Sequence, residues 1–482
     1  MPDRHELDTM FYPGSVAVVG ASSRPDGGSG ARYVSRLHER GFAGGIYPVN
    51  PGATEIHGLK AYPDVKSLPE LVDLVIVAVP APRVPEVLED CIATGVKNVH
   101  IYSSGFSETR EEEGRKLEER IIEITKRGGL RVVGPNCMGI YVPASKLVAW
   151  GTPPTTNGPI AFISQSGGHS EFFINFAQGL GIHFSKVVSF GNACGLKVLD
   201  FLEYLADDPE TGIITMYLED IKDGNRATQL IKGINRTKPV IVWKGGVTDS
   251  GSRAIASHTG SLAGEEMVWR AFFAQTGAVR VNSLEEIADV VLAFQHLAPP
   301  RGWRTLLLGS GGGNSVEMAD ICGREGLEVP PLSSTTRREL ASFIPLAGNI
   351  IRNPLDISQA QEDVDLLRRC LNLVVADPVI DLAILDRHVG NLDDNNSGRE
   401  QRRSKVTEFI IDFIKKNTYN KPLVVSMKAR DLTPDSAALG TRLRRKFASA
   451  GIPAYSSQAT ATKALARYIK YHEFQAVSGE GN

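Results

Sequence analysis

The chain has 482 residues, of which 42% are hydrophobic and 22% are charged; this is an ordinary globular composition, and the length predicts roughly three domains at ~150 residues each. With 53 Lys and Arg against 55 Asp and Glu, the net charge of −2 gives no electrostatic reason to expect nucleic acid or an acidic membrane as a partner. Widely spaced cysteines without a CxxC pair, an N-terminus without an apolar signal core, and no run near the ~20 apolar residues of a membrane span predict a cytoplasmic protein without disulfides, a metal site or a membrane partner.

Residues 1–150 are predicted to form a first α/β domain. SVAVVGAS begins it, and IYPVNP, LVIVAVPAP, VHIYSSGF and RVVGPNC follow at regular intervals. Each apolar run ends in small residues or proline and is followed by an amphipathic stretch, which is typical of βα repeats on a parallel sheet. The polar, proline-containing stretch GTPPTTNG at 151–158 then predicts a linker.

Two more α/β domains are predicted, at 158–298 and 303–482. The first of them runs from IAFISQSGG through VVSFGN, GIITMYLED and PVIVWKGG to the helix SLEEIADVVLAFQHLA. A second proline-containing break, PPRG, separates it from TLLLGSGGGNS, LAILDRH, PLVVSMKA and the terminal helix ATKALARYIKYHEF. The fold class is therefore α/β with parallel sheets throughout.

Ligands of open parallel sheets bind at the carboxyl ends of strands, where helix N-termini offer free N–H groups to phosphates. The first such end is VVGASSRPDGGSG, which has Gly20 at the turn but does not match GxGxxG. Asn50, and not an acid for a ribose hydroxyl, follows the next strand, so NAD is disfavoured relative to other nucleotide-bearing cofactors. A tight turn that simply needs glycine is the alternative interpretation.

The other two candidate ends are ISQSGG at 163–168 and GSGGGNS at 309–315. Each enters a predicted helix, and its backbone amides are suited to hold an anion, although serine at a helix start also serves as an ordinary cap. No GxxxxGK[ST] motif occurs in the chain, so it has no P-loop for ATP.

One histidine stands in an unusual setting, SHTGSLAG at 257–264. A core histidine would have apolar neighbours, and a metal ligand would have a second His, Cys or carboxylate at short spacing. Most residues close to His258 are Ser, Thr, Gly and Ala, which suits a loop whose imidazole meets a phosphate.

Together these motifs resemble the α subunit of the nucleoside-diphosphate-forming acyl-CoA synthetases, the ADP-forming acetyl-CoA synthetases, which are kin to succinyl-CoA synthetase. The likeness runs nearly end to end and also includes SSGFSE, LEYLADDPET, MYLEDIKDG and NPLDI. It implies a CoA-binding Rossmann-like domain followed by two flavodoxin-like domains. It also implies a small carboxylic acid, or its CoA thioester, as the substrate.

The resemblance implies that His258 is a phosphohistidine. Acyl-CoA and phosphate would give acyl phosphate and CoA, the acyl phosphate would phosphorylate His258, and the phosphoryl group would pass to ADP. A neutral imidazole is nucleophilic near pH 7, as this step requires. Glu219 would contact the imidazole and stabilise its cationic form. A capping or surface glutamate at a strand end is the alternative for Glu219.

The resemblance also implies two sets of binding residues. The phosphate-binding set comprises Ser164, Gln165, Ser166, Gly167, Gly312, Gly313 and Asn314. The CoA-binding set comprises Gly20, Ala21, Ser22, Ser23, Asn50, Pro51, Val79, Pro80, Ser104, Gly105, Asn136 and Cys137. Cys137 is expected to pack near the thioester and not to act as a nucleophile, because no His and acid accompany it in sequence.

The ATP-grasp portion of the family is not found among these residues, so we expect a separate β subunit that binds ADP or ATP and Mg²⁺, in a heterotetramer. Two departures leave the acyl group open. Gly168-His169-Ser170 stand where the family usually has Ala-Leu, and ACGLKV at 193–198 replaces a stretch containing acids. His169 either contacts the substrate or is simply a polar residue at a helix start.

Two other functions stay open. The chain could be a regulatory module that binds CoA or acyl-CoA without turnover, or an NAD-linked oxidoreductase. The glycine pattern and SHTGSLAG argue against the oxidoreductase.

Overall fold

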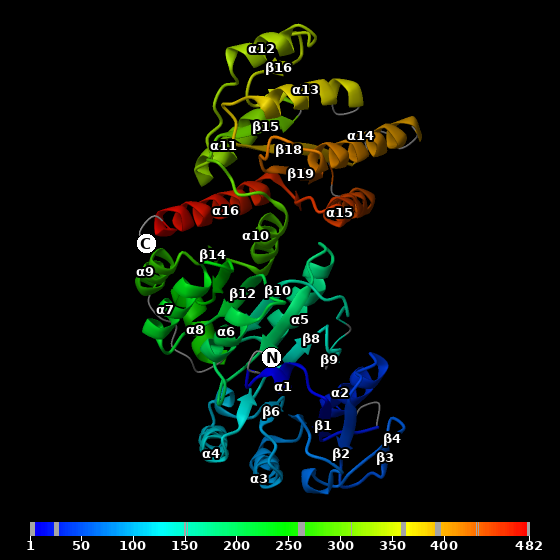
Figure 1. Ribbon diagram of the computed structural model, residues 1–482, viewed down its shortest axis with the longest axis vertical. Helices are drawn as coiled ribbons and strands as arrows, with labels where there is room; N and C mark the ends of the chain where they lie inside the picture. Colours follow the sequence, from blue (N-terminus) through cyan, green and yellow to red (C-terminus); the bar gives the residue numbers. More distant parts are fainter. Residues whose placement is uncertain are drawn as a thin grey trace. The chain divides into compact units, whose positions relative to one another are not determined.

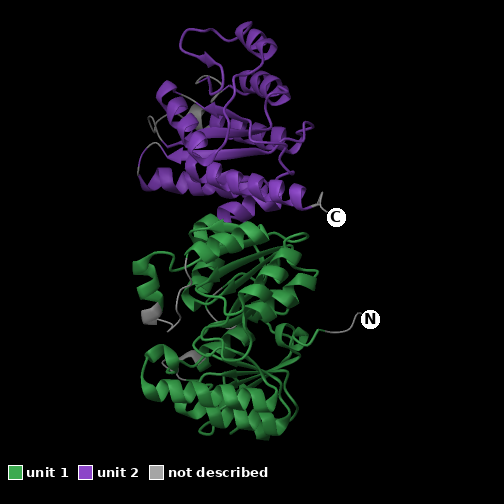
Figure 2. Ribbon diagram, turned by 90° about the vertical axis from the view of Figure 1, so that its left-hand side faces the viewer, with its two compact units in different colours: residues 1–178, 182–287 green, residues 179–181, 288–482 purple. Residues whose placement is uncertain are grey.

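The computed structural model describes residues 5–23, 28–148, 151, 153–258, 266–309, 311–357, 363–390, 397–429, 431 and 433–479. For residues 28, 29, 256–258 and 397–400 it describes the backbone path alone. The chain divides into two compact units, Met1–Gln178 with Ile182–Ile287, and Gly179–Gly181 with Ala288–Asn482 (Figure 2).

The first unit begins with a five-stranded parallel sheet of order β2-β1-β5-β6-β7. A parallel bridge between Val49 and Tyr62 adds one more neighbour outside β2. Counted along the chain, the order becomes 3-2-1-4-5-6, which is that of dinucleotide-binding folds and confirms the Rossmann-like expectation. The strands are β1 (Ser15–Val19), β2 (Gly45–Val49), β5 (Leu74–Val77), β6 (Asn98–Ile101) and β7 (Arg131–Val133).

Helices cover this sheet because its strands are short apolar runs that need burial on both faces, as the fully buried SVAVV of β1 illustrates. α3 and α4 lie side by side, and α2 packs against β1 and β2 (Figure 1). The remaining elements of this region are α1 (Asp8–Phe11), α2 (Gly28–Glu39), β3 (Glu55–Ile56), β4 (Leu59–Lys60), η1 (Val65–Ser67), η2 (Ala81–Arg83), α3 (Val84–Thr94), η3 (Ser107–Thr109) and α4 (Glu112–Gly128).

The second sheet of the first unit has seven strands in the order β14-β13-β12-β10-β11-β8-β9. Its five parallel strands, counted along the chain from β10, have the flavodoxin-like order 2-1-3-4-5. The strands are β8 (Gly139–Val142), β9 (Leu147–Val148), β10 (Ile160–Ser164), β11 (Phe184–Ser189), β12 (Ile213–Leu218), β13 (Val240–Lys244) and β14 (Val279–Val281). The helices are α5 (Gly167–Gln178), α6 (Val198–Asp207), α7 (Gly224–Ile234), α8 (Asp249–His258), α9 (Glu266–Thr276) and α10 (Leu284–His296), of which α10 continues into the second unit.

Residues 139–148 differ from the sequence-based assignment. We place them with the first domain because the proline-containing stretch follows them, yet β8 pairs antiparallel with β11 and so extends the second sheet. Tyr141 is fully buried there, and burial of this short apolar run decides the pairing. The division into three domains stays a prediction.

The second unit contains a six-stranded sheet of order β16-β17-β15-β18-β19-β20, in which only the β16 pairing is antiparallel. Its five parallel strands again have the order 2-1-3-4-5. α11 packs against α16, and α13 packs against α12 and α14 (Figure 1). The strands are β15 (Thr305–Gly309), β16 (Ile350–Ile351), β17 (Leu355–Asp356), β18 (Leu382–Val389), β19 (Leu423–Ala429) and β20 (Ala454–Tyr455). The helices are α11 (Gly312–Glu325), α12 (Ser334–Ala341), α13 (Val364–Ala376), α14 (Ser397–Lys415), α15 (Pro434–Ser449) and α16 (Gln458–Gly479).

Among the described helices, none combines the length and the apolar character that a membrane crossing requires.

Candidate functional site

The carboxyl ends of β10 and β12 meet at the point where the strand order of the second sheet reverses, which is where open sheets bind ligands. The Gln165 side chain joins the two loops that follow these strands. Its Oε1 accepts hydrogen bonds from the N–H groups of Glu219 and Asp220, and its Nε2 donates to Asp220 Oδ1 at 3.1 Å. This residue thereby fixes the start of the ISQSGG turn against the end of MYLED.

Glu219 lies in the interior, with only 4% of the residue exposed. The Tyr217 hydroxyl donates to its Oε1 at 3.3 Å, whereas Oε2 has no hydrogen-bond partner among the described residues. A buried carboxylate oxygen without a donor is costly, and such groups usually serve a function. The alternative of a capping or surface glutamate is therefore wrong, and the site offers one carboxylate oxygen to a donor from outside this part of the chain.

One side chain near Glu219, that of Lys244, was not predicted from the sequence. Lys244 ends β13, is 3% exposed, donates to the Gly245 carbonyl and lies 5.3 Å from the centre of the Trp269 ring. Burial lowers the pKa of Lys244 and outweighs the opposing effect of nearby Glu219. The sequence feature that could have indicated Lys244 is its position in PVIVWKGG, where a lysine ends an apolar strand and precedes Gly-Gly.

His169, one of the departures from the family pattern, packs against aromatic rings. Its ring lies 4.3 Å from that of Tyr217, edge on, and 5.0 Å from that of Trp243. Burial lowers the pKa of His169, so the neutral imidazole is favoured. His169 thus packs at the start of α5, beside the ring of Tyr217, whose hydroxyl donates to Glu219.

The opposite wall comes from the loop after β7 and from the FGN loop after β11. Asn136 has a positive φ of 57°, and its Nδ2 donates to Asn192 Oδ1 at 3.3 Å. Asn192 in turn donates to Glu108 at 2.7 Å and to Glu118 at 2.8 Å. A Cβ at Gly191 would lie 2.2 Å from the Pro135 carbonyl oxygen, so this close approach requires glycine. Asn192 was also missed as a site residue.

These walls enclose a cavity of about 240 Å³, which we call the central cavity. The predicted site residues that line it are Ser104, Asn136, Cys137, Gln165, Ser166, Gly167 and Glu219. Ser166 caps α5 by accepting from the His169 N–H at 3.3 Å, and Ser164 lies beneath, donating to the Ser166 carbonyl at 2.8 Å. The central cavity is therefore lined by the α5 N-terminus, which carries partial positive charge, by the buried carboxylate of Glu219 and by the loops of the first sheet.

Cys137 is buried, and its Sγ lies 3.6 Å from the Ile101 carbonyl oxygen. Burial raises the pKa of the thiol well above its usual range, so the nucleophilic thiolate is disfavoured. The geometry agrees with the expectation that Cys137 packs in the site and does not react.

His100 lies beneath this loop, and its buried imidazole should make the free energy of unfolding depend on pH. It is 2% exposed, and its burial lowers its pKa to about 4. An unfolded-chain histidine titrates near pH ~6.5, so the contribution of neutral His100 to stability is fully present above that pH and is lost as the pH falls toward 4. The loss should approach about 1.4 kcal/mol per pH unit.

Unfolding by urea at a series of pH values would measure this slope. His100→Gln should give a shallower slope between pH ~6.5 and ~4.5 than the native chain, because it removes one group that the unfolded state protonates. Parallel slopes for the two proteins would contradict the assignment.

The remaining CoA-set residues lie on loops at the carboxyl edge of the first sheet. Gly20 has φ +90°, and a Cβ there would lie 2.4 Å from the Ala78 carbonyl oxygen. Asn50 Nδ2 donates to the Ala21 carbonyl at 2.7 Å and Oδ1 accepts from the Gly52 N–H at 2.8 Å, so Asn50 shapes these loops. The others on these loops are Ser22, Ser23, Pro51, Val79, Pro80 and Gly105. Residues 24–27 of the first turn lie outside the described residues.

Two predicted groups cannot be compared with the central cavity, because one lies outside the described residues and the other belongs to the second unit. α8 ends at His258, whose side chain lies outside the described part of the structure, as do residues 259–265. Gly312, Gly313 and Asn314 begin α11 in the second unit.

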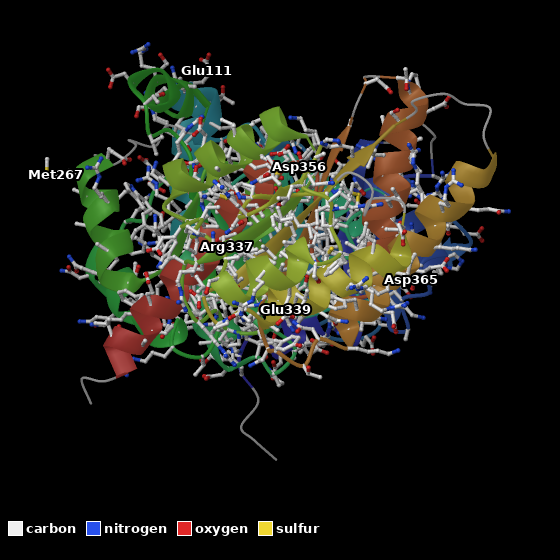
Figure 3. The ribbon with its side chains drawn as sticks, turned by 90° about the horizontal axis from the view of Figure 1, so that it is seen from above. Glu111, Met267, Arg337, Glu339, Asp356 and Asp365 are labelled. Atoms are coloured by element: carbon white, nitrogen blue, oxygen red, sulfur yellow. The ribbon has the colours of Figure 1, made fainter. Side chains whose placement is uncertain are left out.

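The start of α11 is fixed by two carboxylates. Asp356, labelled in Figure 3, accepts from the Gly311 N–H at 2.8 Å, and Asp386 accepts from Asn314 Nδ2 at 3.0 Å. Burial alone would raise the pKa of Asp386, but hydrogen bonds from His388, Ser426 and Asn314 outweigh it and hold the pKa below its usual range. A Cβ added at Gly312 or Gly313 would meet no atom within 4 Å, so nothing in the described chain requires glycine there.

Within the described ranges, no three His, Cys, Asp or Glu side chains gather as metal ligands.

Comparison with known proteins places this geometry in a family. A CoA binding domain matches residues 14–143, and a succinyl-CoA ligase like flavodoxin domain matches residues 157–294. The chain is 34% identical over 98% of its length to the α subunit of acetate–CoA ligase [ADP-forming] I of Pyrococcus furiosus, of which 98% is covered. It is 39% identical over 78% of its length to the α subunit of isoform II of the same organism, of which 81% is covered.

A solved structure is similar over almost the whole chain. It is the dinucleotide forming acetyl-coenzyme A synthetase 1 of Ca. Korarchaeum cryptofilum in complex with phosphate and ADP, with a TM-score of 0.84, 30% identity and 99% of each chain covered. The fold, the matched domains and these relatives together establish that the chain belongs to the family of ADP-forming acyl-CoA synthetases.

Proposed function

We propose that the chain is the α subunit of an ADP-forming acyl-CoA synthetase, an acid–thiol ligase that works through acyl phosphate and a phosphohistidine at His258. One observation carries the proposal. The central cavity combines the first-sheet loops with Asn136 and Cys137, the N-terminus of α5, and a carboxylate, Glu219, of which one oxygen has no donor among the described residues.

Each wall supplies one part of the chemistry. The α5 N-terminus holds phosphate through backbone N–H groups, and a phosphate oxygen attacks the thioester carbonyl carbon. The C–S bond breaks, CoA leaves as the thiol after taking up a proton, and acyl phosphate remains. The first-sheet loops position the thioester. The hydrogen bonds of the Gln165 side chain to Glu219 and Asp220 keep the phosphate-binding turn in place.

The second step transfers the phosphoryl group. A neutral His258 imidazole attacks phosphorus, the bond from phosphorus to the acyl oxygen breaks, and the carboxylic acid leaves as its carboxylate. Glu219 Oε2 accepts a hydrogen bond from the N–H group of the imidazole. This hydrogen bond selects the tautomer that leaves the other nitrogen free to attack, and the carboxylate stabilises the positive ring that forms. The phosphohistidine then passes its phosphoryl group to ADP. Mg²⁺ bound with ADP on the partner subunit would neutralise the negative charge of the phosphates.

The partner is proposed to be an ATP-grasp β subunit in a heterotetramer. Both relatives from Pyrococcus furiosus carry the name of an α subunit, which implies a further subunit for them. In this chain, the first turn of α9 exposes Met267 (75%), which projects outward in Figure 3, and Val268 (64%). These apolar side chains come two and three residues after position 265 in the sequence, and they suit contact with a second protein. A cytoplasmic location fits the five cysteines, which are all free and buried.

Labelling of the purified chain tests the proposal. Radioactive phosphate is added with a panel of acyl-CoA thioesters, and CoA and NADH binding are measured by titration. We expect an acid-labile, alkali-stable label that maps to the peptide containing His258, together with CoA binding and no NADH binding. CoA binding without label from any thioester would favour a regulatory module that binds CoA. The absence of CoA binding would contradict both functions.

A further inference from the structure

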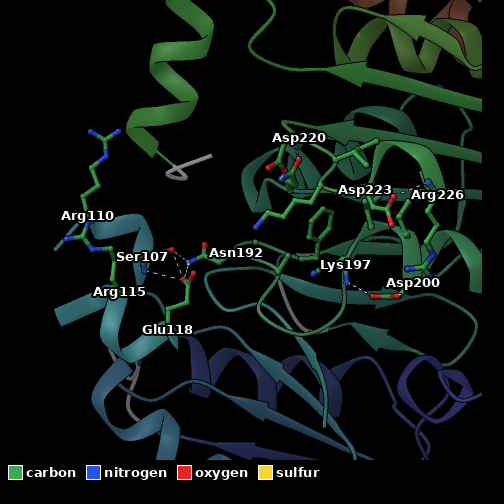
Figure 4. Close-up of a pocket in the computed structure, with 18 residues that line it drawn as sticks. Ser107, Arg110, Arg115, Glu118, Asn192, Lys197, Asp200, Asp220, Asp223 and Arg226 are labelled. Atoms are coloured by element: carbon green, nitrogen blue, oxygen red, sulfur yellow. Dashed lines mark hydrogen bonds and ion pairs between the residues drawn. The ribbon is translucent and has the colours of Figure 1, made fainter. Parts of the chain in front are cut away.

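A second and larger cavity opens beside the central cavity and has no part in the function proposed above. It has a volume of about 620 Å³, within the ~300–1,000 Å³ range of small-molecule sites. We call it the side cavity. Gln165, Gly191 and Asn192 line both cavities, so the two spaces adjoin at the FGN loop. Figure 4 shows its lining side chains, which come from α4, α6 and α7 and from the loops that precede them.

The departure at 193–198 forms part of this side cavity. Ala193, Lys197 and Val198 all line it. Val198 and the neighbouring Phe190 and Leu199 are buried hydrophobic residues, and Ile221 faces the same space from the loop after β12. Apolar side chains therefore form a wall that methylene groups of a ligand could cover.

The acidic side chains of the side cavity are already engaged. Asp200 accepts from the Lys197 N–H at 2.8 Å, and Asp223 caps α7 by accepting from the Arg226 N–H at 3.0 Å. Glu118 accepts from Asn192, and Asp220 accepts from Gln165. None of these carboxylates neutralises a lysine of the lining.

Among the residues that the structure describes, five cationic side chains line the side cavity, Arg110, Arg115, Lys197, Lys222 and Arg226, and Arg226 lies 3.8 Å from Asp200 of the lining. Arg115 and Arg226 form ion pairs with carboxylates outside the lining, at 2.6 and 2.7 Å. Lys197 and Lys222 line the cavity and form no ion pair within the described part of the chain. The side cavity therefore presents two ammonium groups, those of Lys197 and Lys222, that have no ion-pair partner among the described residues, together with an apolar wall.

We propose that the side cavity binds the acyl chain of the substrate and that this chain is longer than acetyl and ends in a second carboxylate. The reacting carboxyl group lies at Gln165, Gly191 and Asn192, where the cavities adjoin. The methylene groups cover Phe190, Val198 and Ile221, and Lys222 and Lys197 bind the distal carboxylate. This inference rests on the proposed function and specifies its substrate as a dicarboxylic acid.

The labelling assay, run with the full chain, tests the inference through a pair of thioesters of equal length. Glutaryl-CoA carries the distal carboxylate, valeryl-CoA replaces it by a methyl group, and acetyl-CoA serves as the short reference. We expect the native chain to use glutaryl-CoA at least about tenfold better than valeryl-CoA in kcat/KM, because a charge-assisted contact is made only by the former.

Lys222→Gln should lower the glutaryl-to-valeryl ratio about tenfold, and Lys197→Gln should lower it in the same direction. Lys232→Gln, an exposed lysine in the last turn of α7, is the matched control and should leave the ratio unchanged. Ile221→Phe, which fills the cavity without changing charge, should disfavour both long thioesters relative to acetyl-CoA. A native preference for acetyl-CoA, or a ratio that Lys222→Gln leaves unchanged, would overturn the inference.

A binding measurement separates this inference from the proposed function. If no thioester labels the native chain, the proposed function fails, and calorimetry with free glutarate and free valerate then tests the cavity alone. Glutarate binding that Lys222→Gln weakens would support the side cavity as a dicarboxylate site. Equal binding of both acids, or of neither, would overturn it.

Discussion

A chain in which His258 is replaced by alanine is expected to take up no acid-labile phosphate label with any thioester. The methyl group of alanine has no lone pair to attack phosphorus, so the reaction must stop at acyl phosphate. The label should fall below detection, and CoA binding should persist because no residue of the first-sheet loops changes. His38→Ala, an exposed histidine in α2, is the matched control and should label as the native chain does.

The same experiment can identify the intermediate. Acyl phosphate that forms on His258→Ala can be trapped with hydroxylamine as the acyl hydroxamate, which separates the first step from the second. If the His258→Ala chain carried a label with the same acid lability and alkali stability as the label on the native chain, the phosphoryl group would lie on another residue. That result would contradict the proposed role of His258.

Replacing Glu219 by glutamine is expected to slow phosphorylation of His258 by about 10²–10⁴-fold, the range seen when a charged partner or transition-state donor is removed from an active site. The glutamine fills the same volume but lacks the negative charge that stabilises the positive imidazole. Single-turnover labelling measures the rate. Stability gives a second readout, because the buried Oε2 has no donor among the described residues, so removal of the charge should not lower the midpoint of thermal unfolding.

This pair of readouts distinguishes a functional carboxylate from a structural one. Glu119→Gln, on the exposed face of α4, provides the control for loss of one negative charge. A Glu219→Gln chain that unfolds several degrees earlier yet labels within a few-fold of the native rate would assign Glu219 to the fold alone.

Much of the site was predictable because it depends on local sequence. Short apolar runs that end in small residues predicted most of the parallel strands but not β8, β9, β14, β16, β17 and β20, and the glycine-rich turns predicted the starts of α5 and α11. The carboxyl ends of parallel strands meet at one edge of a sheet, which explains why Gln165 and Glu219, assigned separately through the resemblance, lie together in the structure.

The remaining features depend on contacts between distant residues. Asn192 binds Glu118, which lies 74 residues away, and no local pattern marks either as a partner of the other. Lys244 stands out only once β13 is placed beside β12, since its burial comes from neighbours such as Trp269. The side cavity likewise arises between elements that are separated in sequence, so its volume and its uncompensated lysines were not predictable.

One connection has a mechanical consequence. β7 ends at Val133 in the first sheet and β8 starts at Gly139 in the second, so the short loop containing Asn136 and Cys137 is anchored at both ends in different sheets. A hinge between the two halves of this unit would have to break the hydrogen bonds that the N–H groups of Asn192, Cys194 and Leu196 donate to the carbonyls of Pro135, Gly134 and Val132. The two walls of the central cavity therefore behave as one fixed frame.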